Sequence, residues 1–327
     1  MKVGIDAFTI RELNLSPYGI LDYAKSMDFR GVQFGNIRTL SENLDVGELR
    51  ALRDYADEHD LYTYVSITCI NPFVYKDGFD SLKECLEREI SAAAAGGWHE
   101  LHTYINGDME RYNHPIPWNR HIDKAIHMIN RLRPTLERYG SRINIETHVE
   151  TTFDILKVIE ATDDHLTGVC LDTANTFVNA EDPVLAAKRV APYIQLTHIK
   201  DSIITLGDEG VVRQGRAPGM GDVDFENILP ILGEYCPDLP LSIEDHKWLF
   251  VANIFDKEWI DKNPDLTAYE LGQIVQLAWK THQKISNGVV PTIDEYEKTP
   301  YLDEMKERLI YGRDYLNGLI HRLGLCT

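Results

Sequence analysis

Four polar residues stand at the ends of four short, apolar stretches that are typical of buried β-strands. Each stretch finishes in a carboxylate or an imidazole, groups that bind metals and transfer protons in enzymes. The four residues are Glu146, Asp172, His198 and Glu244. The first three are evenly spaced and the fourth follows a longer interval. This spacing predicts one strand–helix unit between successive residues and an inserted loop before the last.

Three carboxylates at the same end of neighbouring strands repel one another strongly unless they are protonated or neutralised by a cation. Oxygen ligands with a single imidazole suit a divalent ion that keeps open positions for a substrate. We therefore predict one metal ion held by all four residues, with Mn²⁺ as the first choice and Mg²⁺, Co²⁺ or Zn²⁺ as alternatives. A single such residue is usually a helix cap or a solvated loop residue, but four strand ends that agree favour the metal.

The rest of the sequence supplies the elements that position these residues. Strand-like stretches alternate with amphipathic helical patterns, which predicts a parallel sheet with helical crossovers. The predicted strands span residues 2–8, 31–35, 61–68, 98–105, 142–146, 166–172, 193–199 and 239–245. Eight such units favour an α/β fold, a (β/α)8 TIM barrel over residues 1–250, with its active site at the carboxyl ends of the strands. A doubly wound sheet is the alternative, but no glycine fingerprint follows the first strand.

The C-terminal part of the sequence, residues 251–327, is rich in helical patterns. We interpret it as a helical extension that packs on the barrel or lies at an oligomer interface. Barrels of this type commonly form homo-oligomers, which is the assembly we expect. A hetero-oligomer with a small second subunit is the alternative.

The composition limits the classes of function. The chain of 327 residues has a formal net charge of −19, which repels the phosphate backbone of nucleic acids and favours a small, neutral polar substrate. No stretch approaches the roughly 20 apolar residues of a membrane helix, and the first residues do not resemble a signal peptide. The five scattered cysteines predict reduced thiols. We expect a soluble, cytoplasmic enzyme with neither nucleic-acid nor membrane partners.

Several short motifs carry a specific resemblance. The stretches "NIETH", "CLDTAN", "THIKD" and "SIED", with the loop "PGMGDVDF", resemble the sugar phosphate isomerase/epimerase family, whose barrel is of the xylose isomerase type. The resemblance implies a metal-dependent isomerase or epimerase that acts on a sugar or keto-sugar through a metal-stabilised enediolate. It assigns the metal to Glu146, Asp172, His198 and Glu244, and the acid/base pair to Glu146 and Glu244.

Two departures from the epimerase pattern keep a second reaction open. Asn175 stands where epimerases carry a histidine, and the loop after His198 is long. These features favour the alternative of a metal-dependent lyase on a keto-sugar. It would resemble inosose dehydratases, or the α-subunit of a C-glycoside-cleaving enzyme, which acts on 3-keto-glycosides with a small second subunit. An abasic-site endonuclease, disfavoured by the net charge, and a non-catalytic sugar-binding module are more distant alternatives.

Five further residues are candidates for catalysis or substrate contact. His148 lies two residues after Glu146 and is therefore expected on the same face of the chain. It is either a catalytic base or a hydrogen-bonding support. Lys200 and His246 follow the third and fourth strand ends in the same way and are expected to face the same mouth. His102 on the fourth predicted strand and Arg216 in the long loop complete the candidates for substrate binding.

Overall fold

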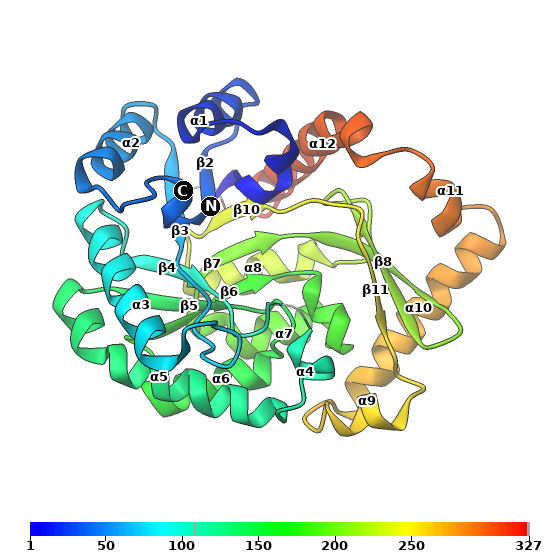
Figure 1. Ribbon diagram of the computed structural model, residues 1–327. Coiled ribbons are helices and arrows are strands. Elements are labelled where there is room, and N and C mark those ends of the chain that lie inside the picture. Colours follow the sequence, from blue (N-terminus) through cyan, green and yellow to red (C-terminus); the bar gives the residue numbers. More distant parts are fainter. Residues whose placement is uncertain (108, 326–327) are drawn as a thin grey trace.

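Eight parallel strands close into a barrel at the centre of the computed structural model, which describes residues 1–107 and 109–325 (Figure 1). The strands are β1 Lys2–Asp6, β2 Gly31–Asn36, β3 Tyr62–Ser66, β4 Glu100–Thr103, β5 Arg142–Glu146, β6 Thr167–Asp172, β7 Ile194–Ile199 and β10 Pro240–Ile243. Their order around the barrel follows the order in the sequence, and β10 closes the ring by pairing with β1. The predicted TIM barrel is confirmed. Cys326, one of the predicted thiols, lies outside the described residues.

Helices between the strands surround the barrel (Figure 1). Local sequence determines several of their ends: α6 begins at a capping box of Thr151 and Asp154, and α5 ends at Gly140, whose φ of 58° suits glycine. The helices up to β10 are α1 Pro17–Ser26, α2 Val46–Glu58, α3 Gly78–Ala95, α4 Glu110–Asn113, α5 Trp118–Tyr139, α6 Thr152–Thr162, α7 Pro183–Val190 and α8 Phe225–Tyr235. Short 3₁₀ helices span Ala7–Leu13, Ile37–Thr39, Asn175–Asn179 and Ala191–Tyr193.

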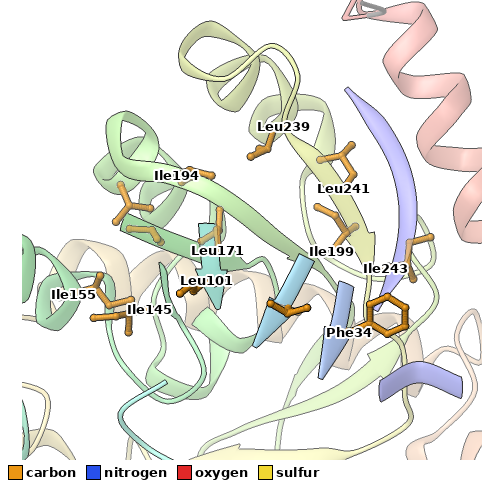
Figure 2. Close-up of a cluster of buried hydrophobic side chains, with 14 of the residues drawn as sticks. Phe34, Leu101, Ile145, Ile155, Leu171, Ile194, Ile199, Leu239, Leu241 and Ile243 are labelled. Atoms are coloured by element: carbon orange, nitrogen blue, oxygen red, sulfur yellow. The ribbon is translucent and has the colours of Figure 1, made fainter. Parts of the chain in front are cut away.

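Apolar side chains of the barrel strands pack outward against the helices. Figure 2 shows this core, which includes Ile145, Leu171, Ile199 and Ile243, each fully buried. Every one of these residues is adjacent in sequence to one of the four predicted site residues. Because successive side chains of a strand point to opposite faces, the neighbours of this apolar layer face the barrel interior. The packing of the core therefore decides that the site residues point inward.

The long loop predicted after His198 is in fact a β-hairpin. Strands β8 Asp201–Leu206 and β9 Val211–Arg216 pair antiparallel, and β11 Leu249–Ala252 joins the other edge of β9. At Gly215 a Cβ atom would lie 1.9 Å from the carbonyl oxygen of His246, so only glycine permits this close approach. The hairpin thus packs directly on the segment that follows β10.

The C-terminal part of the described chain is helical, as predicted. Its helices are α9 Lys257–Asp261, α10 Ala268–Ser286, α11 Ile293–Glu297 and α12 Tyr301–Arg322. Helix α10 packs on β8, whereas α12 packs against β1 and β10 of the barrel and buries residues that include Leu309 and Leu316. The division of the chain at residue 250 stays a prediction, but α12 covers the barrel where the first and last strands meet.

Candidate metal centre and active site

The barrel brings the four strand-end residues together at one point. They are Glu146, Asp172, His198 and Glu244, which we call the carboxylate cluster. One ligand atom from each residue lies within 4.8 Å of the ligand atoms of the other three, and all four side chains are buried. They lie at the carboxyl ends of four neighbouring strands, which is where the sequence places them.

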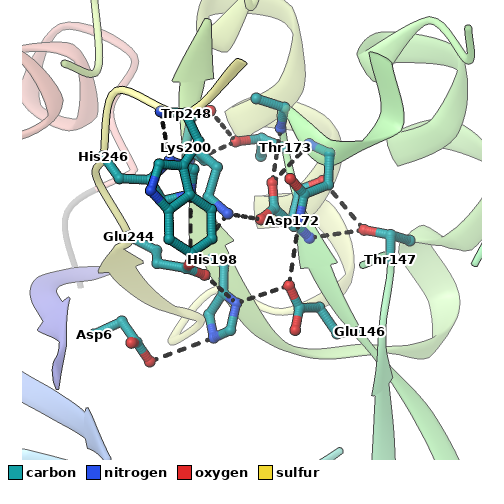
Figure 3. A network of polar contacts seen from close by, with 12 residues as sticks. Asp6, Glu146, Thr147, Asp172, Thr173, His198, Lys200, Glu244, His246 and Trp248 are labelled. Atoms are coloured by element: carbon teal, nitrogen blue, oxygen red, sulfur yellow. Dashed lines mark hydrogen bonds and ion pairs between the residues drawn. The ribbon is translucent and has the colours of Figure 1, made fainter. Parts of the chain in front are cut away.

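His198 lies at the centre of this cluster (Figure 3). Its Nδ1 atom is 2.8 Å from Oε2 of Glu244 and 3.2 Å from Oε1 of Glu146. Its other ring nitrogen, Nε2, is 3.5 Å from Oδ2 of Asp6 and 2.6 Å from Nε2 of Gln33. The Nδ1 edge of the imidazole therefore faces the carboxylates of the cluster, and the Nε2 edge faces β1 and β2.

Lys200 is the basic side chain that pairs with the cluster. Its Nζ atom lies 2.7 Å from Oδ2 of Asp172 and 3.1 Å from Oε1 of Glu244, and only 3% of the residue is exposed. Lys200 was predicted to face the mouth of the barrel, and its ammonium group does lie among the carboxylates. One ammonium does not balance three carboxylates, so the cluster retains negative charge.

The residues of the cluster fit a divalent cation. Asp172 Oδ2 and His198 Nδ1 are buried and make no hydrogen bond of good geometry within the described chain, although both have ionisable neighbours. Buried polar atoms in this condition are expected to have a further partner. Carboxylate oxygens with one imidazole nitrogen form a suitable donor set for such an ion, and its charge would neutralise the excess negative charge.

Burial disfavours the charged form of every ionisable group in the site, whereas the ion pairs favour it. For Lys200, burial lowers the pKa, but Asp172 and Glu244 outweigh it and raise the pKa above its ordinary value. For Glu244, burial raises the pKa, but Lys200 and His198 outweigh it and lower the pKa. Burial lowers the pKa of His198, but Cys170, Glu146 and Glu244 outweigh it and raise the pKa. For Asp172, burial outweighs Lys200 and raises the pKa. The neighbouring charges therefore favour the charged forms of Lys200, Glu244 and His198, whereas burial prevails at Asp172.

Neighbouring side chains hold both oxygens of Glu146. Nε2 of His102 lies 3.0 Å from Oε2, and Nδ1 of the same ring lies 2.7 Å from the hydroxyl of Ser66. The Nδ2 group of Asn175 donates to Oε1 at 3.4 Å. His102 lines the cavity, but both of its ring nitrogens contact protein atoms and orient the carboxylate, and its contact with a substrate stays a prediction.

His148 lies beside Glu146 in the cavity wall. Its Nδ1 atom is 2.8 Å from the carbonyl oxygen of Asn106, so Nδ1 carries the proton and, in the neutral ring, Nε2 is the acceptor. Burial lowers the pKa of His148, but Glu146 and Glu150 outweigh it and raise the pKa. This arrangement suits a group that takes part in proton transfer.

A cavity of about 730 Å³ opens at the carboxylate cluster. Its wall includes Lys200, His246, Phe8 and Trp248, and the last two rings are in edge-to-face contact, with their centroids 5.5 Å apart. Volumes of roughly 300–1,000 Å³ are typical of small-molecule sites. His246, a predicted contact, thus lies in the wall of a cavity that is large enough for a sugar.

Arg216 does not line this cavity, in contrast to the prediction that it contacts the substrate. Its guanidinium lies over the ring of Tyr296 in α11, 3.2 Å from the ring centroid. Side chains alternate along β9, so Arg213 takes the opposite face, where it lies 5.2 Å from the ring centroid of Phe250 in the cavity wall. The hairpin therefore turns Arg216 toward the C-terminal helices.

A family model described as the xylose isomerase-like TIM barrel matches residues 21–262. This range spans most of the barrel and all four residues of the carboxylate cluster. The chain belongs to the xylose isomerase-like TIM barrel family. Among the described residues, no helix is both long and apolar enough to span a membrane.

Individual known proteins are similar to the chain to different extents. The protein YihM of Escherichia coli K12 is 24% identical over 256 residues, which cover 76% of this chain and 73% of YihM. An inosose dehydratase of Clostridium botulinum is 32% identical over 118 residues, which cover 33% of this chain and 40% of that enzyme. The crystal structure of a D-psicose 3-epimerase superposes with a TM-score of 0.59 at 15% identity, over 85% of this chain and 99% of the epimerase.

Some residues of this xylose isomerase-like site were not identified from the sequence. Asp6 ends β1, Gln33 lies within β2 and Ser66 ends β3, and all three lie next to a member of the cluster or to its partner His102. The one signal was the presence of a polar residue in an otherwise apolar strand, as in "GVQFG". Such a residue is more often accommodated by local hydrogen bonds, so the signal alone does not indicate a site.

Proposed function

We propose that this protein is a divalent-cation-dependent isomerase or epimerase that moves a proton next to the carbonyl group of a sugar or keto-sugar. One observation carries the proposal: Glu146 and Glu244 lie on two sides of the same His198 nitrogen, 3.2 and 2.8 Å from it, and both line one cavity. Two carboxylates so placed can serve the two faces of one carbon atom. The names of similar proteins, among them the D-psicose 3-epimerase and the inosose dehydratase, support a sugar or sugar-like polyol as the substrate.

The residues of the cluster would hold the cation through Glu146, Asp172, His198 and Glu244. We propose Mn²⁺, with Mg²⁺, Co²⁺ and Zn²⁺ as alternatives. When bound, the cation supplies an electrophile that polarises the carbonyl group and acidifies the neighbouring C–H bond. Lys200 and His198 lower the pKa of Glu244, and His198 and His102 lower the pKa of Glu146, so both carboxylates are ionised and able to accept a proton.

The proton transfers fall to the residues that line the cavity. Glu146 removes the proton: His102 orients the carboxylate through Oε2, and Oε1, which also accepts from Asn175, faces the cluster. Glu244 serves the opposite face, and His148 is the alternative base. The ammonium of Lys200, 3.1 Å from Glu244, binds a substrate oxygen and stabilises the negative charge that develops there. Trp248 and His246 complete the wall around the sugar.

A second candidate is a lyase that uses the same proton abstraction and then expels a leaving group. Two observations favour it: a buried ammonium, Lys200, lies where it can stabilise the negative charge on a departing oxygen, and inosose dehydratases are among the similar proteins. Asn175, which contacts Glu146, occupies the position of the epimerase histidine. If the lyase is the α-subunit of a C-glycoside-cleaving enzyme, its substrate would be a 3-keto-glycoside and it would work with a small second subunit.

Proton NMR in D₂O tests the proposal. The protein is stripped with EDTA, reloaded with Mn²⁺ and incubated with a panel of keto-sugars and 3-keto-glycosides. We expect exchange of the hydrogen next to the carbonyl and formation of an isomer. Loss of water or of an aglycone would instead establish the lyase.

Substitutions separate the proposed roles. Glu146→Gln and Glu244→Gln should each lower the exchange rate by about 10²–10⁴-fold, the usual contribution of an acid/base residue. Glu100→Gln is the matched control, since Glu100 begins β4 and lies at the opposite end of the barrel, where it accepts from Asn144. Normal exchange by both site variants, or by protein without a divalent ion, would refute the proposal.

A further inference from the structure

The amide of Gln33 lies on the edge of His198 that faces away from the carboxylates. Gln33 is in the middle of β2 and is fully buried. Its Nε2 atom is 2.6 Å from Nε2 of His198, and its Oε1 atom has no hydrogen-bond partner within the described chain. A buried amide oxygen without a hydrogen-bond partner leaves one acceptor of the side chain unused.

A cation that binds one ring nitrogen of His198 determines whether the other ring nitrogen carries a proton. Nδ1 of His198 faces Glu146 and Glu244, so Nδ1 is the atom that would bind the ion. A neutral imidazole has one N–H group, and a ring that gives its Nδ1 lone pair to an ion carries the proton on Nε2. That N–H then needs an acceptor in a buried site.

Two oxygen-bearing side chains lie near Nε2, whereas the sulfur of Cys170, which also lies near the ring, is only a weak acceptor. Asp6 Oδ2 is 3.5 Å from Nε2, a long distance for a hydrogen bond, while Oδ1 of the same carboxylate already accepts from the backbone of Phe8. Gln33 is nearer, at 2.6 Å. A half-turn of its amide exchanges the nitrogen for Oε1 and places a carbonyl acceptor in front of the N–H group.

We propose that Gln33 is a positioning residue: its amide oxygen accepts from Nε2–H of His198 and so keeps Nδ1 available to the cation. The inference rests on the cation site of the proposed function. The amide can take either orientation, because one end donates and the other accepts. Side chains that hold the outer nitrogen of a metal-binding histidine fix its proton and its ring orientation, and their loss typically weakens binding by 10–100-fold.

Three variants test the role of Gln33 by isothermal titration with Mn²⁺, which does not depend on turnover. Gln33→Met keeps the length of the side chain but removes the acceptor, and we expect its Kd for Mn²⁺ to rise by 10–100-fold. Gln33→Glu restores an acceptor and should bind within threefold of the wild type or more tightly. Thr63→Val is the matched control, because Thr63 is buried in neighbouring β3 and accepts from Trp98, away from the cluster.

The outcomes separate this inference from the proposed function. A Gln33→Met protein that binds Mn²⁺ as tightly as the wild type, or a Gln33→Glu protein as weak as Gln33→Met, overturns the role of Gln33 alone. Equal weakening by Thr63→Val would show that general loss of stability is the cause, and it overturns the role as well. A wild-type protein that binds no divalent ion overturns the cation site itself.

Discussion

A buried ion pair joins helix α12 to the residue that follows Glu244 in sequence. Arg308 Nη2 lies 2.6 Å from Oδ1 of Asp245, and Arg308 Nε lies 2.7 Å from Oδ2, so that the pair is bidentate. Asp245 is 1% exposed and Arg308 is 6% exposed. We predict that this pair makes α12 a substantial contributor to the stability of the barrel.

The expected magnitude follows from burial. Replacement of Arg308 by methionine leaves the Asp245 carboxylate buried without a partner, which costs about 3–5 kcal/mol of the free energy of unfolding. At about 2 °C per kcal/mol for a chain of this size, the melting temperature should fall by roughly 6–10 °C. The second single variant, Asp245→Asn, removes the other charge of the pair. In the double variant Asp245→Asn/Arg308→Met neither charge remains, so its loss of stability should be about 2–3 kcal/mol smaller than the sum of the two single losses.

The assay is thermal and urea unfolding followed by circular dichroism, with Arg322→Met as the control on the same helix. Arg322 pairs with Glu226, but both side chains are more than 60% exposed, so its loss should cost at most about 1 kcal/mol. A loss at Arg308→Met no larger than the loss at Arg322→Met would refute the argument. Strict additivity of the two single variants would show that the ion pair itself contributes nothing.

Three further predictions concern the site. Lys200→Met should lower the melting temperature of the cation-free protein but tighten Mn²⁺ binding, since it removes a positive charge from the carboxylates; weaker binding in a titration would contradict this. His148→Gln tests the alternative base: if His148 removes the proton, exchange should fall by about 10²-fold or more while the Kd for Mn²⁺ stays within threefold, and unchanged exchange would refute that role. Gly215→Ala should destabilise the protein by more than about 2 kcal/mol in urea unfolding, because the new methyl group meets the carbonyl of His246; an unchanged midpoint would disprove that contact.

The alternation of eight barrel strands with helices could be predicted because it depends on local features. Apolar stretches, helical periodicity and turn residues recur in order, and the barrel follows from their alternation. The family match and the closed sheet confirm this part of the prediction. The cluster of carboxylates could be anticipated for the same reason, since parallel strands place all their carboxyl ends on one side. Its metal and its catalytic roles stay predictions.

The hairpin after β7 shows where local features are insufficient. Its sequence predicts a loop with Arg216 in the site, but β8 and β9 pair with each other, and β9 also pairs with β11 from a later part of the chain. Which face of β9 meets the barrel depends on that pairing and on the packing of α11. Alternation alone cannot distinguish the face of Arg213 from that of Arg216.

The sequence by itself determined the types of groups at the strand ends and the alternation that separates them from the apolar core. These are properties of neighbouring residues, so they can be inferred without coordinates. Only the tertiary structure decided that Gln33 meets His198 and that His102 meets Glu146. Those contacts depend on barrel closure and strand register, which bring together residues more than 40 positions apart in the chain.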